Sequence, residues 1–486
     1  MPDRLPNILL AISDDQAWPH ASAYGCPFVN TPNFDRVADE GVLFSHAYCT
    51  APSCSPSRAS LLTGRNPWEL REGGILWSFL PAEFDVYPDI LERVGYHVGH
   101  TYKGWGPGSI ELSGRTRNPA GPAYNRRQND PPTTRMSRND YAANFGDFLA
   151  ARPDGAPFCF WYGAKEPHRV YEKGSGLRAG KRLEDVMVPP YLPDCEEVRS
   201  DLLDYALEIE WFDEHLGRML AMVEEMGELD NTIIVVTGDN GLPFPRAKAN
   251  LYEQGMHVPM AIRYGEKVPG GRTVTDFMTF VDLAPTFLEA AGLEIPGNMT
   301  GRSLMPVLTL DQQGRVDPER DHVLTGIERH AYARAGNTGY PSRCIRTDEF
   351  VYIRNFEPER WPAGDPPAFG DIDGSPTKNY MIANKDAPDV QPLYELAFGK
   401  RPAEELYAVK DGYACTCNLA DDEAYAEERR SLWGQMEREL TDQKDPRMLG
   451  EGGVFETYPY VPIVQNPAAA DEFVGMDDLR ANGLVD

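Results

Sequence analysis

Three carboxylates and an amide stand directly after two apolar segments of the chain. Asp14 and Asp15 follow residues 7–12, and Asp239 and Asn240 follow residues 232–236. Oxygen ligands of this kind favour Ca²⁺ or Mg²⁺ over zinc. Without a cation, clustered carboxylates would repel one another, and one of them would have to remain protonated. Each pair alone also fits a plainer interpretation, in which Asp14 caps a helix and Asp239 lies in a turn. Together they predict a site for Ca²⁺, with Mg²⁺ as the alternative.

A second segment, Cys54-Ser55-Pro56-Ser57-Arg58, combines a nucleophile with a cation. Pro56 suits the first turn of a helix, which places Cys54 at the positive end of the helix dipole. Arg58 follows four residues later and therefore lies on the same helix face. Such an arrangement binds anions. Taken by itself, it is equally compatible with a reactive thiolate.

The hydrophobic pattern predicts the elements that must position these groups. Continuous apolar runs at 7–12, 158–162 and 232–236 are typical of strands buried on both faces. Segments 31–38, 198–226 and 283–291 have helical spacing. Strands that alternate with helices predict an α/β fold, in which a mostly parallel sheet is covered on both faces. Ligands of such sheets bind beyond the carboxyl ends of the strands, where the candidate residues stand.

The composition changes after about residue 310. Residues 343–356 alternate like an antiparallel strand, 357–400 are rich in Pro, Gly and Asp and predict a long loop, and 419–436 return to helical spacing. We therefore divide the chain into an α/β domain, 1–335, and a smaller C-terminal α+β subdomain, 336–486. The subdomain is expected to contain an antiparallel sheet, a loop-rich insertion and an acidic tail.

Composition excludes several classes of function. The 486 residues carry a net charge of −28, with 41% hydrophobic and 25% charged residues, which is ordinary for a globular protein. The negative charge argues against nucleic-acid binding. No apolar stretch approaches the roughly 20 residues that span a bilayer. The chain begins without a signal peptide, so we expect a cytoplasmic protein, or a periplasmic or secreted one if a leader was trimmed.

The stretch from Cys54 to Arg65, CSPSRASLLTGR, resembles the signature of the type I, formylglycine-dependent sulfatases, which belong to the alkaline-phosphatase-like superfamily. The resemblance covers nearly the whole chain. It includes Asp14-Asp15, Lys103 in YKGW, His168 in EPHR, Asp239-Asn240 and Lys248. Segments 188–194 and 239–245 are most similar to the heparan N-sulfatase (sulfamidase) branch, and Glu-Leu-Tyr at 405–407 with Asn-Leu-Ala at 418–420 resemble family motifs in the second domain.

The resemblance implies an alkaline-phosphatase-like α/β/α sandwich and a sulfohydrolase acting on a sulfated mono- or oligosaccharide. Cys54 would be converted to formylglycine by a formylglycine-generating or sulfatase-maturing enzyme. Its hydrated aldehyde would attack sulfur with one hydroxyl and release sulfate with the help of the other. Asp14, Asp15, Asp239 and Asn240 would hold the cation. Lys103 and Lys248 would bind sulfate, and Arg58 would contribute with them to the electrostatic preorganisation of the site. His168 would protonate the leaving oxygen or nitrogen.

The chain departs from the family pattern at two positions. Trp105 stands where many relatives have a histidine, and Lys248 stands where the sulfamidase branch tends to have arginine. Candidates for sugar binding are Trp105, Arg169, Glu328 and His330. The substrate is expected to be N-sulfoglucosamine or an O-sulfated saccharide, and the acidic charge favours a short one cleaved at its end. The alternatives are a phosphodiesterase or phosphonate monoester hydrolase of the same superfamily, and a non-catalytic binder of sulfated glycans.

Overall fold

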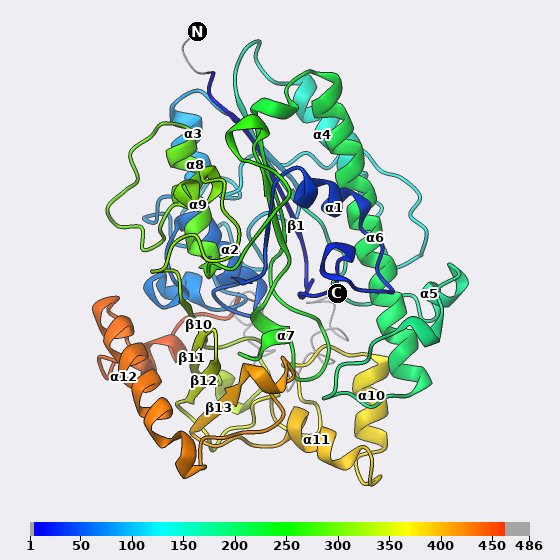
Figure 1. The fold of residues 1–486 in the computed structure, drawn as a ribbon, viewed down its shortest axis with the longest axis vertical. Helices are drawn as coiled ribbons and strands as arrows, with labels where there is room; N and C mark the ends of the chain where they lie inside the picture. Colours follow the sequence, from blue (N-terminus) through cyan, green and yellow to red (C-terminus); the bar gives the residue numbers. More distant parts are fainter. Residues whose placement is uncertain (1–3, 462–486) are drawn as a thin grey trace.

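A seven-stranded sheet forms the centre of the protein (Figure 1), whose computed structural model describes residues 4–461. The strand order is β4-β5-β1-β6-β7-β2-β8. The strands are β1 (Asn7–Ser13), β2 (Val42–Phe44), β4 (His97–Tyr102), β5 (Phe158–Gly163), β6 (Thr232–Gly238), β7 (Met260–Arg263) and β8 (Arg272–Val274). Neighbours run parallel except at β7, which is antiparallel to both β6 and β2. The predicted mostly parallel sheet is confirmed.

The strands at the centre of the sheet are apolar throughout because both of their faces are covered. Along β1, Ile8, Leu10 and Ile12 belong to one hydrophobic core, whereas Leu9 and Ala11 belong to another. Successive side chains of a strand point to opposite faces. A strand between two layers of helices therefore needs an apolar residue at every position.

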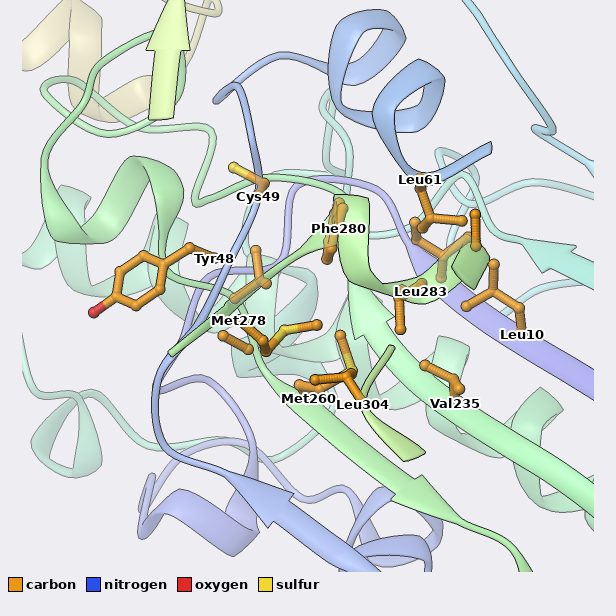
Figure 2. Packing of buried hydrophobic residues seen from close by; sticks show 14 of the residues in the cluster. Leu10, Tyr48, Cys49, Leu61, Val235, Met260, Met278, Phe280, Leu283 and Leu304 are labelled. Atoms are coloured by element: carbon orange, nitrogen blue, oxygen red, sulfur yellow. The ribbon is translucent and has the colours of Figure 1, made fainter. Parts of the chain in front are cut away.

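Helices cover both faces of the sheet (Figure 1). One layer consists of α1 (Pro32–Asp39), α4 (Tyr141–Ala150) and α6 (Glu196–Glu225), and the other of α2 (Cys54–Thr63), α3 (Tyr87–Arg93) and α8 (Leu283–Ala290). Figure 2 shows part of the second core, where Leu61 and Leu283 pack with Leu10 and Val235 of the strands. The predicted α/β/α sandwich and the predicted helices at 31–38, 198–226 and 283–291 are confirmed.

Shorter elements complete the larger unit. They are β3 (Ala47–Tyr48) paired with β9 (Met278–Thr279), and the helices α5 (Ser175–Arg178), α7 (Glu253–Met256) and α9 (Met305–Thr309). In residues 4–461, no helix is both long enough and apolar enough to cross a membrane.

A four-stranded antiparallel sheet follows, with the order β10 (His322–Ile327), β11 (Ser342–Thr347), β12 (Phe350–Asn355) and β13 (Glu404–Ala408). It lies with α12 (Ala426–Asp442) below the carboxyl end of β1 in Figure 1. The strand expected at 343–356 is a hairpin of β11 and β12, and the helix expected from 419 begins only at Ala426. Strand β10 lies before residue 335. The antiparallel sheet therefore begins on the N-terminal side of the domain boundary that the composition predicts.

The prediction of a long loop at 357–400 is wrong in part, because this segment contains two helices, α10 (Pro376–Ala383) and α11 (Gln391–Phe398). The Ser375 side chain accepts a hydrogen bond from the Lys378 amide, and Pro376 occupies the first turn of α10. Both residues favour a helix start. Met381 and Phe398 join a core that includes Leu202 of α6, so tertiary packing stabilises these short helices. The acidic tail predicted at the C-terminus falls outside the described residues, which end at 461.

Candidate active site

The carboxyl ends of four adjacent strands bring the predicted residues together. Asp14 and Asp15 follow β1, Asp239 and Asn240 follow β6, Lys103 follows β4, and His168 lies in the loop after β5. Strands β1 and β6 pair in register as far as Ser13 and Gly238, so their two acidic ends lie side by side. The backbone amide of Asp15 donates a hydrogen bond of 3.0 Å to Asp239 Oδ1 across this junction.

Helix α2 presents Cys54 to the same place. Cys54 is the first residue of the helix, and its Sγ donates to Asp14 Oδ1 at 3.4 Å. Arg58, one turn later and fully buried, donates through Nε to Asp239 Oδ2 at 2.7 Å. Its Nη1 donates to the carbonyl oxygens of Lys103 and Gly104 at 2.7 and 3.0 Å. Arg58 therefore ties the start of α2 to the ends of β6 and β4.

The acidic residues form a candidate cation site. Asp14, Asp15, Cys54 and Asp239 each offer one ligand atom, and these atoms all lie within 4.8 Å of one another. Asn240 Nδ2 donates to Asp15 Oδ1 at 2.7 Å, while Asn240 Oδ1 is buried and accepts no hydrogen bond from any described residue. A buried acceptor beside three carboxylates is unfavourable unless something positive satisfies it. The donor set fits Ca²⁺ or Mg²⁺.

The pKa values of the three carboxyls also indicate that too little positive charge surrounds them. Burial raises the pKa of Asp15 to about 6, which Lys248 opposes and the charge of Asp14 reinforces. Burial and the charge of Asp14 likewise raise the pKa of Asp239 to about 6. Burial acts on Asp14 in the same direction, but Lys103 and His168 outweigh it and hold that pKa below its usual range. A divalent cation would balance the negative charges of Asp15 and Asp239, which the lysine and arginine side chains of the site do not balance fully.

Backbone strain accompanies the site. Asp15 has a φ of 74°, Tyr102 just before Lys103 has 57°, and Arg246 and Ala249 on either side of Lys248 have 67° and 63°. Positive φ is uncommon outside glycine and persists only where surrounding contacts hold it. These conformations occur at or beside three predicted site residues that lie in different segments of the chain.

The two lysines contact the carboxylates of the candidate cation site. Lys103 Nζ pairs with Asp14, and Lys248 Nζ lies 2.7 Å from Asp15 Oδ2 and 3.3 Å from Asp373 Oδ2. Once a cation neutralised Asp14 and Asp15, both ammonium groups would be available for an anionic ligand.

His168 also lies near Asp15, with Nε2 3.9 Å from Asp15 Oδ2. Its Nδ1 is 2.7 Å from the Arg169 carbonyl oxygen, which can only accept, so Nδ1 carries the hydrogen. Burial and Lys248 lower the pKa of His168 to about 4. Burial and Asp14 raise the pKa of Cys54 well above its usual value. These observations give no support to the reactive-thiolate interpretation of the unmodified Cys54.

A cavity of about 410 Å³ opens onto these groups. Asp14, Cys54, Lys103, His168 and Lys248 line it together with apolar residues and further polar ones: Leu76, Trp77, Tyr102, Trp105, Pro107, Asn118, Lys165, His330 and Asp373. Two predicted sugar-binding residues therefore border the site. Trp105 is only 4% exposed and belongs mostly to the hydrophobic core. His330 Nδ1 lies 2.8 Å from the hydroxyl of Ser53, next to Cys54.

The other two predicted sugar-binding residues do not line this cavity. Arg169 is buried in a bidentate ion pair with Asp201, at 2.8 and 2.9 Å, and borders a separate cavity of about 670 Å³. Glu328 is buried between Arg343 and Arg447, at 2.8 and 2.7 Å. Their charges are paired inside the fold, and neither residue lines the cavity at residue 54.

Sequence reasoning missed Asp373 and Trp77, which line the cavity from distant parts of the chain. Asp373 lies just before α10, in the segment expected to be a loop. Its only local signal was the Ser375-Pro376 helix start, which would have shown that the preceding residues are held in place. No spacing in the sequence relates either residue to Cys54.

Comparisons with known proteins agree with this geometry. The family model described as Sulfatase matches residues 6–293, and a model described as N-sulphoglucosamine sulphohydrolase, C-terminal, matches residues 246–365. Human N-sulphoglucosamine sulphohydrolase is 26% identical over 93% of each chain. An ulvan-active sulfatase of Formosa agariphila is 26% identical over 93% of this chain and 77% of its own. The fold resembles a solved complex with D-glucosamine-2-N,6-O-disulfate, with a TM-score of 0.65, 22% identity and coverage of 91% and 99%.

Proposed function

Because this chain belongs to the sulfatase family, we propose that it hydrolyses a sulfated saccharide by means of a formylglycine made from Cys54 and a divalent cation held by Asp14, Asp15, Asp239 and Asn240. The single observation that carries the proposal is the convergence of these residues with Arg58, Lys103, Lys248 and His168 at one cavity. A degenerate, non-catalytic binder would have no need for this complete set.

The comparisons and the cavity support the proposed substrate class. The named relatives act on N-sulphoglucosamine and on ulvan, so both an N-sulfated glucosamine and an O-sulfated saccharide are candidates. A cavity of about 410 Å³ accommodates one or two sugar rings. Trp77 and Tyr102 offer apolar ring surfaces at its wall.

The chain's own residues supply charge stabilisation and a proton. Lys103 and Lys248 would bind the sulfate oxygens, while Arg58 holds Asp239 in place and opposes the rise in its pKa. A formylglycine hydrate at position 54 would supply a nucleophilic hydroxyl, and a cation held by Asp14, Asp15, Asp239 and Asn240 would supply Lewis acidity.

His168 would protonate the leaving atom as a general acid. Its Nε2 is the free ring nitrogen because Nδ1 donates to the Arg169 carbonyl. The pKa of about 4 describes the site without ligand, where Lys248 opposes protonation. A sulfate anion bound between Lys248 and His168 would raise the pKa of His168 and favour its imidazolium form, in which Nε2 carries a proton.

Maturation must precede the completion of folding. Cys54 is 2% exposed and its Sγ bonds to Asp14, so an enzyme that oxidises the side chain could not reach it in the folded protein. The partner we propose is a formylglycine-generating or sulfatase-maturing enzyme that acts on the extended segment around residue 54.

Two measurements test the proposal. Sulfate release should be measured from N-sulfoglucosamine and from O-sulfated mono- and disaccharides, with an aryl sulfate and an aryl phosphonate monoester for comparison. The mass of the peptide that contains residue 54 should be about 18 Da below that of the cysteine form, since aldehyde replaces thiol. Cys54→Ala should abolish release, whereas Cys344→Ala, at a buried cysteine of β11, should not. No release from any sulfate in aldehyde-containing protein, or faster turnover of the phosphonate, would contradict the proposal.

A further inference from the structure

A segment of the C-terminal insertion reaches into the catalytic cavity. Asp373, three residues before α10, is 6% exposed, lines the cavity, and lies 3.3 Å from Lys248 Nζ through its Oδ2. It is separated by more than a hundred residues of chain from every other acidic group of the site. This carboxylate is not needed for the cation site, whose ligand atoms lie at β1, β6 and α2.

The position of Asp373 is held by its neighbours. Asp371, two residues earlier, accepts a hydrogen bond from the Ala331 amide at 2.9 Å and pairs with Arg334 at 2.7 Å. The segment is therefore anchored beside His330, which lines the same cavity. After Asp373, the capped start of α10 fixes the chain from the other side. A carboxylate held at both ends in this way has a defined place in the cavity.

The charge of Asp373 is felt by several groups of the site. It raises the pKa of Asp15, and it partly offsets the lowering of the pKa values of His168 and His330. Asp15, His168 and His330 lie in three different segments of the chain, and the two histidines line the cavity together with Asp373. Its negative charge stands next to Lys248, where the sulfate group is expected.

A fixed carboxylate beside a sulfate-binding site has a clear chemical consequence. It cannot assist the reacting sulfate directly, because the two charges have the same sign. It can accept a hydrogen bond from a hydroxyl or ammonium group on a neighbouring carbon of the sugar. A second sulfate on that carbon would face it with like charge, and such juxtapositions exclude wrong partners from binding sites.

Building on the proposed function, we propose that Asp373 determines substrate specificity. It accepts a hydrogen bond from the hydroxyl or amino group next to the sulfated position, and it excludes saccharides that carry a second sulfate there. The substrate class is then a saccharide with an isolated sulfate, or one whose neighbouring sulfate has already been removed by another sulfohydrolase.

The test compares two pairs of substrates that differ only at the neighbouring position. These are N-sulfoglucosamine against glucosamine N,3-O-disulfate, and galactose 4-sulfate against galactose 3,4-disulfate. The wild-type enzyme is expected to favour the monosulfated member in kcat/KM by at least roughly tenfold, mainly through KM, in whichever pair it hydrolyses. In Asp373→Asn, which keeps the shape but removes the charge, this preference should shrink by a similar factor.

Further variants separate charge from folding. Asp373→Glu retains the charge and should retain the preference, and Asp373→Ser should lose it, which covers the case of an unstable Asp373→Asn protein. Asp365→Asn is the matched control: this residue lies in the same insertion, its Oδ2 accepts from the Ala335 amide, and it is not part of the cavity lining. It should leave the preference unchanged.

The outcomes distinguish this inference from the proposed function. If the wild-type enzyme hydrolyses both members of a pair equally well, or if Asp373→Asn and Asp373→Ser keep the full preference, the role of Asp373 is refuted while the sulfatase activity stands. If no member of either pair and no other sulfate is hydrolysed, the proposed function itself fails.

Discussion

Removing the cation should uncover an electrostatic cost whose size follows from the structure. Asp15 and Asp239 have pKa values of about 6 instead of 3.8, which corresponds to about 3 kcal/mol for ionising each carboxyl. Without metal, these two carboxyls therefore bind more protons in the folded protein than in the unfolded chain between about pH 4 and pH 6. Their contribution to stability then falls as the pH rises through this window. Bound Ca²⁺ would keep both groups ionised and would remove that fall.

Thermal unfolding of EDTA-treated protein, with and without added Ca²⁺, measures this effect. At pH 7 and a hundredfold excess of Ca²⁺ over its Kd, binding contributes about 2.7 kcal/mol. For a chain of this length we expect a rise in Tm of about 2–3 °C. The rise should be smaller at pH 5, because protons compete for Asp15 and Asp239. Calorimetry near pH 6 should detect the release of about one proton per ion.

Two matched variants make the experiment specific. Asp239→Asn should lose most of the Ca²⁺-induced rise in Tm. Asp213→Asn should keep it, although burial raises the pKa of Asp213 to about 6 as well. The oxygens of Asp213 accept from the amides of Asn33 and Phe34 at the start of α1, away from the cluster. Equal Tm values with EDTA and with Ca²⁺ at pH 7, or loss of the rise in Asp213→Asn, would refute the reasoning.

Three further predictions concern single side chains. Arg58→Met should lower stability by about 3–5 kcal/mol in urea unfolding, because Asp239 is left buried without its partner, and should abolish sulfate release; an unchanged midpoint would contradict this. His168→Gln should reduce kcat by about 10²–10⁴ for a saccharide sulfate but much less for an aryl sulfate, whose leaving group needs no proton; equal losses for both would exclude the general-acid role. Burial acts to raise the pKa of Glu228, but hydrogen bonds from Arg152, Arg4 and Asn7 lower it to about 2. Its stabilising contribution is therefore present above about pH 4.5 and is lost as the pH falls towards 2. Glu228→Gln should lower the free energy of unfolding by about 1–3 kcal/mol at pH 7 and by much less at pH 3, and equal losses at the two pH values would contradict the assignment.

Much of the fold and the main site could be predicted from the sequence because both depend on local pattern. A strand covered on both faces must be apolar at every position, so β1, β5 and β6 were recognisable without a structure. Polar residues directly after such strands must gather at one sheet edge. This rule alone predicts that Asp14 and Asp239 lie close together, as the pairing of β1 with β6 requires. The sulfatase resemblance, which the family comparison confirms, likewise depends on contiguous motifs.

The insertion at 357–400 shows where local pattern fails. Its Pro, Gly and Asp content predicts a loop, yet α10 and α11 form there because Met381 and Phe398 join a hydrophobic core that includes residues of α6. Helices this short are not stable by propensity alone. Tertiary burial decides whether they form, and burial by a distant helix leaves no trace in the local sequence.

The sequence by itself determined the sheet, the helices beside it and the residues at the carboxyl ends of its strands, because hydrophobic period and strand ends are properties of contiguous chain. Only the tertiary structure decided how charges are used. Arg169 and Glu328 form buried ion pairs inside the fold, whereas Asp373 lines the cavity beside Lys248. A charged side chain serves whichever opposite charge the fold places next to it, and residues more than a hundred positions apart acquire that relation only when the chain is packed.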